Sequence, residues 1–154
     1  MTVLLSRFRG NGVAAFALAG LLVLLLVAAL APVLPIADPL DHDPYNTLAA
    51  PSAEHILGTD NQGRDLLSRS IYGARVSLLV SIVSIGVAMV VGTIFGVLAG
   101  YWRGWTEVAI MRVADSLMAF PALILGIAVM AILGSGLDKV ILCLAIVMTP
   151  RFTR

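Results

Sequence analysis

Long apolar runs separated by short polar segments dominate the sequence. The run from Val13 to Leu34 covers about 22 residues, so as a helix it measures about 33 Å and can cross a hydrocarbon layer of about 30 Å. Further apolar runs follow over 76–100 and 107–133, and a shorter one begins at Val140. The pattern predicts an all-α integral membrane protein, a polytopic helical bundle with three clear spans and a fourth partial one.

The polar stretch 35–75 separates the first two apolar runs. Its first half is rich in Pro, Asp and Asn and is expected to be irregular and extended. From Gly63 the spacing of Leu67, Ile71 and Ala74 is helical, which predicts an amphipathic elbow helix over about 63–75. The predicted order is a tail 1–12, span 13–34, loop 35–75, span 76–100, turn 101–106, span 107–133, turn 134–139, and a fourth span beginning in the end segment 140–154.

Charge orients these segments. The tail carries Arg7 and Arg9 without an acid, whereas acidic residues outnumber arginines in the loop 35–75. The positive-inside rule therefore places the N-terminus in the cytoplasm and the loop outside. The first run is longer than the core of a signal peptide, so we expect a retained span. The aromatic and basic turn at 101–105 is typical of an inner-leaflet connection, with rings anchoring the helix ends, and Arg154 fits a cytoplasmic end.

Composition excludes several other classes of protein. The chain is 60% hydrophobic and 12% charged, which is more apolar than a soluble domain of this size, and a net charge of +1 gives no basic stripe for nucleic acid. The single Cys143 permits no disulfide or thiolate metal site within one chain. The adjacent side chains of Asp41, His42 and Asp43 diverge on an extended chain, so no metal site is expected. No phosphate-loop, HExxH or GxSxG motif occurs, and we expect neither enzymatic activity nor a cofactor.

Small residues recur at a four-residue spacing in the second span. Such a face lets another helix approach closely, so the spacing predicts a helix-packing seam; the alternative is that glycine is simply common in membrane helices. The seam residues are Ala88, Gly92, Gly96 and Gly100. The serines of this span, Ser84 among them, are expected to bond to carbonyls one turn back in the same helix.

The third span begins with polar residues. Glu107, Arg112 and Asp115 precede its apolar part, and Arg112 and Asp115 are spaced to pair on one helix face. Two interpretations stay open: an interfacial pair that faces another subunit, or a contact with a transported substrate. Pro121 removes one backbone hydrogen bond, which predicts a kink.

The fourth apolar run is short for a full crossing, which needs about 20 residues. It reaches that length only if its helix includes Leu137 and continues past Pro150.

Two stretches together resemble a known family. The segment APSAEHILGTDNQGRDLLSRSIYGARVSL resembles the signature after the first transmembrane helix in the permease subunits of dipeptide and oligopeptide ABC importers, a family that includes nickel permeases. The segment GVLAGYWRGWTEVAIMRVADSLMAFPALILGIAVMAILG resembles the second and third spans of the same subunits. The residues singled out in the external signature are Gly58, Thr59, Asp60, Gly63, Arg64, Asp65, Ser68, Arg69, Tyr72, Gly73 and Arg75.

The resemblance implies the N-terminal portion of a C-type permease in a bacterial or archaeal plasma membrane. It implies partners: a second permease subunit, cytoplasmic ATPase subunits and an extracytoplasmic substrate-binding protein. The family also has a Glu-Ala-Ala loop that docks into the ATPase, and this chain stops at Arg154 before such a motif. We therefore expect a fragment of a longer permease or a truncated product. The alternative function is a non-transporting membrane scaffold or remnant. These motifs do not distinguish peptide from nickel substrates.

Overall fold

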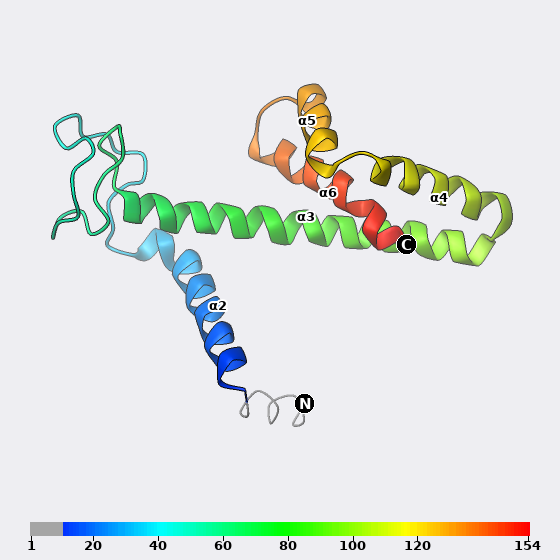
Figure 1. Ribbon diagram of the computed structural model, residues 1–154, viewed down its shortest axis with the longest axis horizontal. Coiled ribbons are helices and arrows are strands. Elements are labelled where there is room, and N and C mark those ends of the chain that lie inside the picture. The colour runs from blue at the N-terminus through cyan, green and yellow to red at the C-terminus, as the bar shows by residue number, and fades with distance from the viewer. Residues whose placement is uncertain (1–10) are drawn as a thin grey trace. The chain divides into compact units, whose positions relative to one another are not determined.

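The computed structural model describes residues 11–154 (Figure 1), so the predicted tail with Arg7 and Arg9 lies outside the described residues. The predicted all-helical class is confirmed: residues 11–154 contain helices and no strand apart from an isolated bridge between Thr59 and Asp65. The chain divides into two compact units, 1–78 and 79–154. The elements are α2 (Gly12–Leu30), η1 (Ala31–Val33), α3 (Leu66–Trp102), α4 (Gly104–Ala119), α5 (Ala122–Leu133) and α6 (Leu137–Thr153).

Helix α2 begins at an Asn cap and is apolar on every face. The Asn11 side chain accepts a hydrogen bond from the backbone N–H of Ala14 at 3.3 Å, which satisfies one of the free donors of the first turn. Large apolar side chains are exposed along this helix, and Phe16, for example, is 82% exposed. Such exposure is expected for a helix that lipid surrounds. Pro32 then stands in the short helix η1, where the chain leaves the apolar run.

Helix α3 is continuous over 37 residues, or about 55 Å. The sequence predicts an elbow over about 63–75 followed by a span over 76–100, and the structure joins both into one helix. No proline interrupts 66–102, and the four-residue glycine repeat does not break the backbone ladder. The interfacial position of the first turns stays a prediction.

The third apolar run is broken into α4 and α5. The axes of these helices differ by 99° across Phe120 and Pro121, a sharper feature than the predicted kink. Phe120 is extended, with ψ 137°, because the proline ring disfavours a helical conformation for the residue before it. Within residues 11–154, α2 with η1 and α3 are long and apolar enough to cross a membrane, and the bent pair is a third candidate if it forms one span.

Helix α6 contains Pro150 and packs against both α4 and α5. Its bounds, Leu137–Thr153, include Leu137 and continue past the proline, as the sequence required for a longer fourth helix. At 17 residues it measures about 26 Å, somewhat less than a hydrocarbon layer of about 30 Å. Pro150 is fully buried.

Candidate functional site

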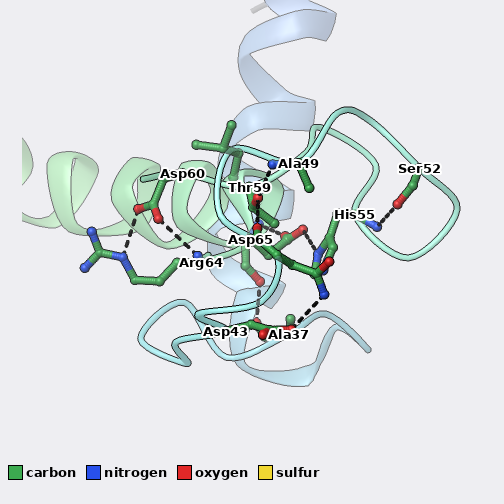
Figure 2. A network of polar contacts seen from close by, with 12 residues as sticks. Ala37, Asp43, Ala49, Ser52, His55, Thr59, Asp60, Arg64 and Asp65 are labelled. Carbon is green, nitrogen blue, oxygen red and sulfur yellow. Dashed lines mark hydrogen bonds and ion pairs between the residues drawn. The ribbon is translucent and has the colours of Figure 1, made fainter. Parts of the chain in front are cut away.

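The signature segment folds into a closed network of polar contacts before α3 (Figure 2). Thr59 lies at its centre and is 4% exposed. Its Oγ1 accepts a hydrogen bond from the backbone N–H of Ala49 at 2.8 Å and donates to the carbonyl of Asn46, while its own N–H donates to the carbonyl of Ala49 at 3.1 Å. Through these bonds, the buried Thr59 holds its own segment of the loop against the segment at 46–49.

Asp60 organises the turn that follows. Its Oδ1 accepts from the backbone N–H groups of Gln62 at 2.8 Å and Arg64 at 3.0 Å. Its Oδ2 accepts from Nε of Arg64 at 2.9 Å and pairs with Nη1 of Arg69 at 3.1 Å. Partial burial acts to raise the pKa of this carboxyl, but the hydrogen bonds from Gln62 and Arg64 outweigh it and lower the pKa from 3.8 to about 2. Asp60 is therefore ionised at any physiological pH.

Asp65 caps the start of α3 and is 7% exposed. Its Oδ2 accepts a hydrogen bond from the backbone N–H of Ser68 at 2.7 Å, as an N-cap side chain does. Its Oδ1 lies 3.1 Å from Nδ1 of His55, ten residues earlier in the chain. Ser68 is fully buried and its Oγ donates to the carbonyl of Ala37. These contacts tie the first turn of α3 to the segment that follows η1.

Two glycines make the tight closure possible. Gly58 and Gly63 have φ of +75° and +76°, in the left-handed region that favours glycine. A Cβ on Gly58 would lie 2.4 Å from the carbonyl oxygen of Ala49, and one on Gly63 would lie 1.8 Å from that of Asp43. Both positions therefore require a residue without a side chain.

In the unit 79–154, α6 lies directly against the small residues of α3. A Cβ on Gly92 would lie 2.7 Å from the carbonyl oxygen of Thr149, and one on Gly96 would lie 2.6 Å from that of Thr153. Ala88 is fully buried, whereas Gly100 has open space around it. The close approach thus involves the middle of the predicted seam, and its role in function stays a prediction.

The expectation for Ser84 is wrong. Its Oγ donates to the carbonyl of Ile141 in α6 at 3.1 Å and not to a carbonyl of its own helix. Ser84 is 1% exposed, so the closely packed α6 offers an acceptor that the sequence of α3 alone does not reveal.

The polar start of the third run is arranged differently from the predicted pair. Glu107 lies in the first turn of α4, where the helix dipole favours an acid. Asp115 forms its ion pair with Arg154, which follows α6, at 3.6 Å, and not with Arg112. Both side chains are more than half exposed, 52% for Asp115 and 66% for Arg154, so the pair contributes at most about 1 kcal/mol.

Comparison with known proteins gives these features a context. Residues 3–51 match the family model of the N-terminal TM domain of oligopeptide transport permease C. The chain is 41% identical over 141 residues to a dipeptide transport system permease protein of Alkalihalophilus pseudofirmus, covering 90% of this chain and 46% of the relative. It is 46% identical over 139 residues to a glutathione transport system permease protein of Pectobacterium atrosepticum, covering 88% and 46%. The chain is a relative of these permeases, and the predicted resemblance is confirmed.

A di/tripeptide transport system permease protein of Pseudomonas aeruginosa is a further relative of this chain. The two are 40% identical over 147 residues, which cover 90% of this chain and 48% of the relative. The chain thus spans about half the length of the curated relatives it matches.

The permease signature divides into two groups of residues in the structure. Gly58 to Arg69 lie in or beside the network, whereas Tyr72, Gly73 and Arg75 lie further along α3. The network also uses residues that were not among the predicted signature residues, and these are Ala37, Asp43, Asn46, Ala49, Ser52 and His55. The role of Asp43 could have been predicted from the sequence, because an Asp before a turn accepts hydrogen bonds from nearby residues. Here the donors are the backbone N–H of Tyr45 and the side chain of Asn46. The backbone contacts of Ala37 and Ala49 could not have been predicted from the sequence.

Proposed function

We propose that this chain is part of the membrane-spanning permease subunit of an ABC importer and forms part of the translocation pathway for peptides or related small solutes. The observation that carries the proposal is the similarity over about nine-tenths of the chain to permease proteins named for dipeptide and glutathione transport. Their named substrates share the chemistry of a short peptide.

The proposed partners are a second permease subunit, cytoplasmic ATPase subunits and an extracytoplasmic substrate-binding protein. The absence of a GxxxxGK[ST] phosphate loop from the sequence supports a division of labour in which a partner hydrolyses ATP. The complex is placed in the plasma membrane of a bacterium or archaeon.

The proposed orientation has the N-terminus in the cytoplasm and the loop 35–75 outside. The distribution of Arg7 and Arg9 against the acids of the loop supports it. In this orientation the network around Thr59, Asp60 and Asp65 presents a fixed surface on the side where a substrate-binding protein delivers its ligand. Its internal hydrogen bonds support a role in positioning that surface rather than in chemistry, because the carboxylates are already occupied by donors.

The close packing of α6 on Gly92 and Gly96 suggests how such a subunit changes between access states. Small residues let the two helices approach closely, and a Cβ on Gly92 or Gly96 would meet α6 atoms at 2.6 Å. We infer that this pair of helices moves as one body when the pathway alternates its access.

The test is to purify the tagged protein from native membranes in mild detergent. The proposal expects an ATPase subunit and a second permease to co-elute, with ATP hydrolysis that rises when a dipeptide and its binding protein are added. A matched Gly96→Leu variant should lose these partners, whereas Gly100→Leu should keep them, since only Gly96 is covered by α6. Elution of the wild-type protein alone, without ATP hydrolysis, contradicts the proposal.

A further inference from the structure

The turn between α3 and α4 carries three exposed aromatic side chains. Tyr101 and Trp102 end α3, and Trp105 is the second residue of α4. Their exposed fractions are 81%, 61% and 89%. In an aqueous protein such exposure would be costly, because each ring carries a large apolar area. A ring with an apolar body and a polar N–H or O–H suits the boundary between acyl chains and headgroups.

Arg103 lies between these rings in an unusual backbone conformation. Its φ is +42°, and the next residue, Gly104, has φ +60°. Glycine is the residue that this region favours, so Arg103 adopts a strained backbone conformation here. Arg103 is exposed, and its guanidinium takes part in none of the ion pairs found within residues 11–154.

The apolar surface of α3 continues up to this turn. Ile94 and Val97 are 53% and 63% exposed, so the side of the helix that hydrocarbon covers ends where the aromatic residues begin. A guanidinium at this end of α3 is suited to bind a phosphate, because its planar group can donate two parallel hydrogen bonds to the phosphate oxygens. Continuity with the lipid-facing surface favours lipid over a soluble partner as the occupant.

We propose that the α3–α4 turn is a phospholipid anchor in which Arg103 binds the lipid phosphate while Trp102 and Trp105 lie at the headgroup and acyl-chain boundary. The anchor sets the depth of this end of α3 in the bilayer. It does not depend on the transport function proposed above.

The sequence offers a clean optical probe, because Trp102 and Trp105 are the 2 tryptophans of the chain. The protein is reconstituted in phosphatidylcholine vesicles that contain lipid brominated either near the headgroup or deep in the acyl chain. The anchor predicts stronger quenching of tryptophan fluorescence by the shallow bromines. Stronger quenching by the deep bromines overturns the anchor. An absence of quenching by both kinds of bromine also overturns it, and this is the result expected if protein covers the turn.

The phosphate contact is tested with matched charge-removing variants. Arg103→Gln should raise acrylamide quenching of the tryptophans about twofold in phosphatidylcholine vesicles, whereas Arg112→Gln, which removes the same charge from within α4, should not. In vesicles of digalactosyldiacylglycerol, which has no phosphate, Arg103→Gln should equal wild type. Arg103→Lys should keep part of the effect, and circular dichroism checks that each variant is folded. An Arg103→Gln variant that matches wild type in both lipids, or differs equally in both, overturns the phosphate contact.

Discussion

A Cβ built on Gly63 would lie 1.8 Å from the carbonyl oxygen of Asp43, so this glycine of the signature segment is in direct contact with backbone twenty residues earlier. The obstacle is backbone and not the end of a flexible side chain, and the φ of +76° adds its own penalty for any other residue. Gly63→Ala should therefore destabilise the loop by at least about 1 kcal/mol. Hydrogen exchange of the loop amides in detergent micelles measures the effect.

Gly73 provides the control, because it belongs to the same signature but a Cβ added to it would meet no atom within 4 Å. Gly73→Ala should leave loop exchange unchanged. Equal exchange rates in Gly63→Ala and wild type would show that Asp43 moves aside without cost.

The contact between α3 and α6 gives a second prediction. Gly96→Ala places a methyl group 2.6 Å from the carbonyl oxygen of Thr153, and such overpacking costs about 1–3 kcal/mol. The thermal unfolding midpoint in detergent should fall for Gly96→Ala and hold or rise for Gly100→Ala, where there is open space. A midpoint that falls equally in both variants would mean that loss of glycine itself, rather than α6, is responsible.

Asp65 gives a third prediction through its cap on α3. Removal of an N-cap carboxylate costs about 1–2 kcal/mol, and here it also leaves His55 without its partner. Asp65→Ala should speed hydrogen exchange in the first turn of α3. Glu54→Ala removes an exposed acid of the same loop and should change it little. Protection that survives in Asp65→Ala would show that the loop contacts alone hold this turn.

Asp60 makes the loop sensitive to strong acid. Its pKa of about 2 lies below the ordinary 3.8, so the carboxylate stabilises the folded loop above about pH 4 and this contribution is lost as the pH falls toward about 2. A spin label at Asn61→Cys, in a Cys143→Ala background, should stay immobile down to about pH 4 and gain mobility below it. Asp60→Asn should flatten this pH dependence. A transition near neutral pH would assign the sensitivity to another group.

The sequence predicts the helices well because a long apolar run has few other solutions in a membrane, as Val13 to Leu34 illustrates. The cap by Asp65 was not among the predictions, although its carboxylate needs only the next turn of the same chain. The sequence does not predict contacts set by folding. Neither the Asp115 and Arg154 pair nor the bond from Ser84 to Ile141 has a signal in spacing.

The same distinction explains the third run. Pro121 indicates that one backbone hydrogen bond is lost. Whether the helix kinks slightly or turns through 99° depends on the backbone conformation of Phe120, which is extended here. In the loop, irregular backbone has no period, so the closure of Gly63 on Asp43 follows from the structure alone.

We propose above that this chain belongs to a peptide-importing permease driven by a separate ATPase. The most direct measurement is the accumulation of a radiolabelled dipeptide in proteoliposomes that contain the complex purified through this chain. The substrate-binding protein is added on the outer side, and ATP is supplied on the side of the ATPase subunits. We expect uptake that requires ATP and is lost in complexes carrying Gly63→Ala. A complete complex that hydrolyses ATP but accumulates no dipeptide and no related small solute would contradict it.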